Sequence, residues 1–296
     1  MLYKTERGMA LVLTLLVVAI ITAMVVEFAY GVYVSTSSLH NWQTSQKLSL
    51  AARSAVKLAG YAISSKMIDK TQAVFEMSQK IPYDNPEGTI SVRIEDEGAK
   101  FNINKMVGTN GNVENIFWYP AMGRLLNALG LKPELADRIV WWINPAARPS
   151  LGPAESAKGS PLDSVEELLL IPGIDRESYE KLLPYVTISN EKINVNTAPV
   201  PILESLSEKI SPAMADRIVA RRQLNPYDSL ADISNTFTEL TSVTMSLQGV
   251  AHGVTGAPTA VFRVTATAES GGIRRIIETV LAASGNRGLI KFWKES

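Results

Sequence analysis

The side chains that most often carry enzyme chemistry are scarce in this sequence. It contains no cysteine, which excludes disulfide frameworks, thiolate zinc sites and cysteine nucleophiles. Its two histidines, His40 and His252, lie far apart in the sequence, and the carboxylates show no spacing that pairs a general acid with a general base. The GxSxG, HExxH, P-loop and dinucleotide-binding motifs do not occur. We therefore expect a protein that is not an enzyme.

The charge balance gives no support for a nucleic-acid partner. The chain has 29 basic and 29 acidic residues, and residues 97–245 carry 14 basic and 18 acidic ones, a net charge of −4. DNA-binding domains normally show a basic footprint. The stretch LLLIPGID (168–175) nevertheless resembles a helix-hairpin-helix turn, whose backbone N–H groups can hold a phosphate. A membrane-anchored DNA-uptake protein therefore stays open as an alternative.

The start of the chain is a charged leader followed by an apolar run. Lys4 and Arg7 precede Gly8, and all but two of the next 18 residues are apolar. As a helix this run is about 27 Å long, close to the hydrocarbon thickness of a bilayer, about 30 Å. We predict a leader over 1–8 and a transmembrane helix over 9–29. Since cations flank only its start, the N-terminus is expected in the cytoplasm and the rest of the chain across the membrane.

Three interpretations of this opening compete. A secretory signal peptide would be cut at a small-x-small site after the apolar run, and none follows it. A plain signal anchor has no need of a glycine at position 8. In the third interpretation the chain is cut between Gly8 and Met9, and the apolar helix stays in the mature protein. The short basic leader, the glycine and the methionine that opens the helix resemble the type IV prepilins and type II secretion pseudopilins.

The pilin resemblance implies specific processing. A prepilin peptidase would cut after Gly8, and Met9 would become the N-methylated first residue of a filament subunit, beside a major pseudopilin. Most members carry glutamate at the fifth mature position, where it pairs with the N-terminal amine of the subunit ahead. This sequence has Leu13 there. An unpaired carboxylate in the membrane is costly, so a subunit with none ahead has no use for it, and its loss is typical of the protein K minor pseudopilins.

The pattern after the membrane segment predicts an α+β fold. Apolar residues at three- and four-residue spacing, from Leu39 to Ile63, extend the helix to about Met67. Residues 90–94 alternate as a strand does, and three more strands lie near the C-terminus, joined by tight turns at Gly271–Gly272 and at 285–288. We expect a long N-terminal helix packed on one antiparallel sheet, with its parts at 30–96 and 246–296 on either side of a large insertion.

The insertion contains an internal repeat, which predicts two helical units over 97–190 and 191–245. Three motifs recur in the same order: KFNIN (100–104) and KINVN (192–196), LADRIV (135–140) and MADRIV (214–219), PLDSVEEL (161–168) and PYDSLADI (226–233). The first copy is longer by a Pro/Ala/Gly/Ser-rich stretch, 144–159, that reads as a surface loop.

Several local features of the insertion follow from the same motifs. Ser164 has the spacing of a capping box with Glu167, and Ser211 precedes Pro212 as a helix cap. The Asp137–Arg138 and Asp216–Arg217 pairs are expected to be solvated surface or local ion pairs.

Taken together, the motifs resemble one family over nearly the whole chain. The leader, DEGAKFNIN, LLLIPGI, INVNTAP and the closing VFRVTATA, IRRIIETVL and KFW are similar to the general secretion pathway protein K family. The resemblance implies two SAM-like (helix-hairpin-helix-like) repeats inserted in a pseudopilin sheet. It also implies a minor pseudopilin that initiates or caps the tip of the type II secretion pseudopilus with other minor pseudopilins, anchored in the inner membrane with its bulk in the periplasm and no nucleic-acid partner. A minor type IV pilin is the alternative.

The same resemblance raises the question of calcium. Members of the family are similar to calcium proteins in the inserted region, where acidic side chains crowd the loop after the first repeat's helix. Calcium takes six to eight oxygen ligands, several of them carboxylates. This sequence offers only Glu155 in that loop, with Asp163 following it. We therefore assign no metal site, keep Glu155 and Asp163 as the calcium candidates, and expect no other cofactor.

Overall fold

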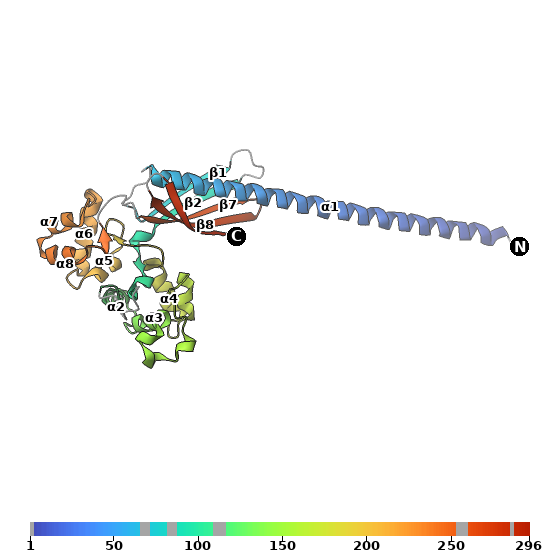
Figure 1. The fold of residues 1–296 in the computed structure, drawn as a ribbon. Coiled ribbons are helices and arrows are strands. Elements are labelled where there is room, and N and C mark those ends of the chain that lie inside the picture. Colours follow the sequence, from blue (N-terminus) through green and yellow to red (C-terminus); the bar gives the residue numbers. More distant parts are fainter. Residues whose placement is uncertain (1–2, 66–71, 82–87, 109–116, 253–259, 285–286) are drawn as a thin grey trace.

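The computed structural model describes residues 3–65, 72–81, 88–108, 117–252, 260–284 and 287–296 (Figure 1). Its α-helices are α1 (Tyr3–Ser64), α2 (Trp118–Ala128), α3 (Leu135–Ile143), α4 (Arg176–Leu182), α5 (Val200–Leu206), α6 (Pro212–Leu224), α7 (Leu230–Thr236) and α8 (Thr241–Ser246). Its strands are β1 (Val74–Ile81), β2 (Gly88–Asp96), β3 (Phe101–Asn102), β4 (Val186–Thr187), β5 (Ile193–Asn194), β6 (Ala251–His252), β7 (Val261–Ser270), β8 (Ile273–Ser284) and β9 (Arg287–Glu295).

Helix α1 has 62 residues and is about 93 Å long. Its N-terminal half stands alone, and its C-terminal half lies on the sheet (Figure 1). Small residues make close packing possible there, since Ala52, Ala55 and Ala59 are buried and a Cβ on Gly60 would lie 3.6 Å from Leu281 Cδ1. The core between helix and sheet also contains Leu48, Val56, Ile63, Val92, Ile94, Val264, Ala266, Ala268, Ile277 and Leu281. The predicted long helix on a sheet is therefore confirmed.

The antiparallel sheet has the order β1-β2-β7-β8-β9. The sequence predicted one strand before the insertion, and that number was wrong, because β1 also precedes it. Gln79 interrupts the apolar face of β1, which hides the alternation of this edge strand. The turn at Gly271–Gly272 is confirmed: it joins β7 to β8, with φ of 57° and 78° at the two glycines. Of the second predicted turn, 285–286 lie outside the described residues.

The insertion takes the place of a hairpin turn. Strands β2 and β7 are antiparallel neighbours, and Asp96 at the end of β2 lies opposite Phe262 at the start of β7. The chain leaves the sheet at Glu97 and is still in the insertion at His252, where β6 pairs with β5. Figure 1 shows the helices of the insertion at the end of the sheet that is far from the N-terminus. A domain has thus been placed between two strands that would otherwise be joined directly.

The two copies of the internal repeat make equivalent contacts. In the first copy, the Asn104 side chain accepts a hydrogen bond from Leu162 N (2.8 Å) and donates one to Leu162 O (2.9 Å). In the second, Asn196 accepts from Tyr227 N (2.9 Å) and donates to Tyr227 O (2.8 Å). Asn104 and Asn196 hold the same place in one repeated motif, and Leu162 and Tyr227 in another. In each copy of the repeat, an asparagine side chain therefore pairs with both backbone polar groups of one residue. We call this pair of hydrogen bonds a clamp.

The predicted helix caps have mixed outcomes. Ser211 accepts a hydrogen bond from Met214 N (3.3 Å) and caps α6, as expected. The capping box at Ser164 was wrong, because residues 165–170 form a 3₁₀ helix and the Ser164 side chain makes no cap bond. Ser229 and Asp232 form a capping box at α7 instead.

Candidate functional site: the anchor helix and the insertion junction

The N-terminal half of α1 is suited to a bilayer. Among the described residues, one helix is long and apolar enough to cross a membrane, with a mean hydropathy of 2.9 over an 18-residue window near the N-terminus. No part of that window is buried by the rest of the protein. The hydroxyls of Thr14 and Thr22 donate to Leu11 O (2.9 Å) and Val18 O (2.8 Å), so they leave no unpaired donor. The N-terminal half of α1 therefore fits a single-pass membrane anchor.

The processing candidates lie at the start of that anchor. Gly8 and Met9 are consecutive residues within α1, and Met9 and Leu13 are exposed along the unpacked half of the helix. Glycine costs a helix about 1 kcal/mol relative to alanine. Gly8 therefore makes local unwinding easier at this step. Leu13 places an apolar side chain where the pilin pattern has a carboxylate.

Beyond the anchor, α1 carries apolar side chains on the side away from the sheet. Leu39, Leu50 and Tyr61 are exposed and are spaced by eleven residues, so they lie almost in line after every third turn. We call these three residues the outer stripe, and Trp42 and Leu58 flank it. Leu39 and Ile63 are the first and last residues of the apolar series that predicted this helix, but only Ile63 is buried. The rest of the described chain leaves these apolar side chains uncovered.

Asp96 is one half of a buried acidic pair where the insertion leaves the sheet. Its carboxylate accepts hydrogen bonds from Thr197 Oγ1 (2.7 Å), Asn194 Nδ2 (2.8 Å) and Gly98 N (2.8 Å). Burial raises the pKa of Asp96, and these three donors oppose that shift. A Cβ at Gly98 would lie 2.9 Å from Asp96 Oδ1, so glycine is needed there. Asp96 thus ties the start of the second repeat to strand β2.

Glu97 is the other half of the pair and is fully buried. Its carboxylate accepts from Lys100 Nζ (3.0 Å), Arg263 Nε (3.1 Å) and the Thr187 hydroxyl. Burial would raise the pKa of Glu97, but the cations of Lys100 and Arg263 hold it below its ordinary value. Arg263 lies on β7 and Thr187 on β4, at the end of the first repeat. Glu97 thus connects the sheet to the first repeat.

Asn190, the last residue of the first repeat, completes the connection. Its side-chain amide donates to Glu97 O (2.7 Å) and Lys100 O (2.6 Å). Together, Asp96, Glu97 and Asn190 form what we call the junction, which contacts β2, β7 and both repeats. Sequence reasoning quoted DEGAKFNIN and INVNTAP as motifs but did not identify this role. The available signal was an acidic pair directly after a strand and before a glycine.

The calcium candidates do not fit a calcium ion. Glu155 is exposed, and Asp163 forms an ion pair with Lys158 (2.7 Å). Lys158 also pairs with Glu167 (2.8 Å). Across the part of the chain that the structure describes, no three His, Asp or Glu side chains are grouped closely enough to hold a metal ion.

The charged pairs of the repeated ADRIV motifs have partners farther along the chain. Asp137 accepts from Tyr119 Oη (2.6 Å) and from Arg148 Nε (2.7 Å), and Tyr119 and Arg148 both lie outside its own helix. Arg217 pairs with Glu239 (3.3 Å). The expectation of solvated surface or a local ion pair holds for Arg217, which is exposed and pairs with Glu239 at the surface. It was wrong for Asp137, because its partners tie separate segments together.

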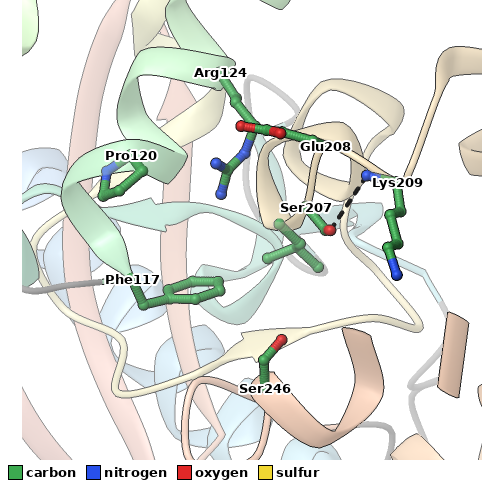
Figure 2. A pocket seen from close by; sticks show the side chains of 8 residues that line it. Phe117, Pro120, Arg124, Ser207, Glu208, Lys209 and Ser246 are labelled. Carbon is green, nitrogen blue, oxygen red and sulfur yellow. Dashed lines mark hydrogen bonds between the residues drawn. The ribbon is translucent and has the colours of Figure 1, made fainter. Parts of the chain in front are cut away.

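A pocket of about 340 Å³ lies between α2, the α5–α6 connection and α8 (Figure 2). It is lined by Phe117, Pro120, Arg124, Leu206, Ser207, Glu208, Lys209 and Ser246. Arg124 Nε donates to Ser205 O (2.8 Å), and Lys209 Nζ donates to Ser242 Oγ (2.9 Å). Both cations are thus engaged in holding adjacent segments together, which suits a structural contact between helices.

These features define a class: a membrane-anchored, pilin-like subunit with a large helical domain inserted in its sheet. Residues 99–191 and 193–254, more than half of the chain, match two family models, both described as type II secretion system protein K. The chain belongs to the type II secretion system protein K family, a structural component of that system.

Relatives and a solved structure agree with this assignment. Type II secretion system protein K of Pseudomonas aeruginosa is 27% identical over 269 residues, covering 81% of this chain and 80% of that protein. The protein of the same name from Klebsiella pneumoniae is 28% identical over 245 residues, covering 74% of each. A chain of the GspK-GspI-GspJ complex from enterotoxigenic Escherichia coli has a TM-score of 0.59 at 17% identity, covering 88% of this chain and 99% of that one. The fold is therefore shared.

Proposed function

We propose that this chain is the minor pseudopilin at the tip of a type II secretion pseudopilus, where it initiates or caps assembly for protein export across the outer membrane. The observation that carries the proposal is the place of the insertion, at the end of the sheet far from the membrane anchor (Figure 1). The hydrogen bonds of the junction fix it there on two neighbouring strands. A rigid domain in that position obstructs the addition of a subunit above.

Leu13 supports the same location because it carries no charge. In a filament interior, a carboxylate at the fifth mature position offsets the charge of a neighbouring N-terminal amine in an apolar environment, where isolated charges cost several kcal/mol. Leu13 gains no such pairing from a subunit ahead. The N-terminal amine of this chain, on Met9 after cleavage, remains available to pair with the glutamate of a subunit below.

Processing and orientation belong to the proposal. A prepilin peptidase cuts between Gly8 and Met9 on the cytoplasmic side, and Met9 is then N-methylated. The anchor stays in the inner membrane until assembly, with the sheet and the two SAM-like repeats in the periplasm. No nucleic acid takes part, in keeping with the net charge of −4 over residues 97–245.

The proposed partners are other minor pseudopilins and, through them, the major pseudopilin. The similar E. coli chain was solved in a complex with GspI and GspJ, and we extend such an assembly to this chain. The outer stripe of α1 offers the apolar contact surface, since Leu39, Leu50 and Tyr61 face away from the sheet. Helices of neighbouring subunits would bury these side chains, and each Å² of apolar surface removed from water would contribute about 25 cal/mol of stabilising free energy.

Cysteine crosslinking tests the proposal, and the absence of native cysteine makes single variants clean probes. Leu50→Cys, on the outer stripe, should crosslink to cysteines in the helices of the other minor pseudopilins in an assembled pseudopilus. Leu224→Cys is the control, because Leu224 is exposed on the insertion and should lie beyond those helices. Crosslinks between copies of this chain along the shaft would contradict the tip location.

A further inference from the structure

Lys158 lies at the convergence of two carboxylates from the next segment of the chain. Its ammonium nitrogen is 2.7 Å from Asp163 Oδ2, and 3.0 and 2.8 Å from Glu167 Oε1 and Oε2. The side chains of Lys158 and Glu167 are only 22% and 18% exposed. Glu167 Oε1 also accepts the backbone N–H of Asp163 (2.9 Å), so its position is fixed from both sides.

The cluster closes the long loop of the first repeat. Lys158 comes at the end of the loop 144–159, and the next residue, Gly159, donates its N–H to Trp142 O (3.0 Å) on α3. The loop is therefore held at α3 by this hydrogen bond, by the Arg148–Asp137 ion pair (2.7 Å) and by Trp141 Nε1, which donates to Gly152 O (3.4 Å). At residues 163–167 it is held by the ammonium. The two carboxylates are four residues apart and would repel each other without a positive charge between them.

The geometry is that of an ammonium and not of a metal site. Oxygen ligands lie 2.3–2.6 Å from calcium in typical sites, which supply six to eight of them. Here two acidic side chains supply three oxygens at charge-assisted hydrogen-bond distances. Burial alone would lower the pKa of Lys158, but the hydrogen bonds and charges of Asp163 and Glu167 together raise it above its ordinary value, so the positive charge is retained.

We propose that the Lys158 ammonium supplies the positive charge that closes loop 144–159, in place of a bound divalent cation. Closure of this loop is then independent of calcium. Because the inference rests on contacts within the insertion, it stands or falls separately from the proposed tip function.

The test measures opening of the loop in the full chain, purified in detergent. Glu155 is exposed within the loop, so cleavage after it by a glutamate-specific protease, followed by mass spectrometry, reports opening. Lys158→Met keeps the apolar stem and removes the charge. It should raise the cleavage rate roughly tenfold, as expected for the loss of one charge-assisted hydrogen bond. Lys181→Met, which breaks an exposed pair with Glu177, is the matched control and should leave the rate unchanged.

Calcium distinguishes the ammonium from a metal. The cleavage rate of the unmodified chain should be the same in chelator and in millimolar calcium. Two results would overturn the proposal: protection of the unmodified chain by calcium, or cleavage of Lys158→Met at the unmodified rate.

Discussion

Replacing Glu97 by glutamine should destabilise the attachment of the insertion more than any exposed charge change. Glutamine keeps the size of the side chain but removes the negative charge that faces Lys100 and Arg263. It also replaces one of the two carboxylate oxygens by an amide group, which cannot accept a hydrogen bond. The junction would therefore lose charge pairing and an acceptor at a fully buried position.

The expected loss in the free energy of unfolding lies between the cost of breaking a buried ion pair and that of breaking a surface ion pair. Breaking a buried ion pair costs about 3–5 kcal/mol. Arg263 keeps a second partner in Glu278, and its side chain is 23% exposed, so its charge is not left uncompensated. We therefore expect a loss of about 2–3 kcal/mol, nearer the value of a hydrogen bond to a charged group. At about 2–4 °C per kcal/mol, the unfolding midpoint should fall by about 4–12 °C.

Thermal unfolding of the full chain in detergent, followed by tryptophan fluorescence, measures this effect. Glu191→Gln is the matched control, because it breaks an exposed pair with Lys105 that is worth about 0–1 kcal/mol. Since the pKa of Glu97 is lowered in the folded state, its contribution exists at neutral pH and is lost as the pH falls below the ordinary glutamate value. The difference in unfolding midpoint between Glu97→Gln and the unmodified chain should therefore become smaller in acid. Equal midpoints for the two variants at pH 7 would refute the reasoning.

Three further predictions address processing, assembly and the insertion. Gly8→Val should block removal of the leader, because the peptidase site needs a small residue, and intact mass of the extracted protein would show the unprocessed chain. Leu13→Glu should leave secretion of exported proteins unchanged, and improved secretion in an export assay would contradict a tip subunit. Asn196→Ala should cost about 2–5 kcal/mol in denaturant unfolding, because it leaves the buried N–H and C=O of Tyr227 unpaired, and Asn104→Ala should cost less because its clamp is only partly buried.

Periodic features were predictable from the sequence because their cause is local. Helix α1 follows from a continuous apolar run and then from small residues at helical spacing. Strand β7 follows from alternation, and two glycines mark the turn that leads into β8. The motif repeat anticipated equivalent contacts because Asn104 and Asn196 occupy matching places. Strand β1 was missed because an edge strand needs only a partial apolar face.

The acidic pair of the junction left a signal in the sequence, but its partners could not be predicted because they are distant in the sequence. Asp96 meets Asn194 and Thr197 only after the intervening repeat has folded. The same limit explains the wrong cap at Ser164. Its spacing is that of a capping box, but the Glu167 carboxylate is already engaged by Lys158 and by the Asp163 N–H. Local pattern rules do not include such competition.

The attachment of the insertion to two adjacent strands also determines how the protein would bear a mechanical load. A push or pull on the insertion along the strand direction enters the sheet at one end of β2 and β7 together. It passes sideways into β1 and β8 through ladders that run the length of those strands. Such a load shears many hydrogen bonds at once and does not peel them open one at a time. The sheet would therefore transmit axial force from the insertion to α1 as a stiff element.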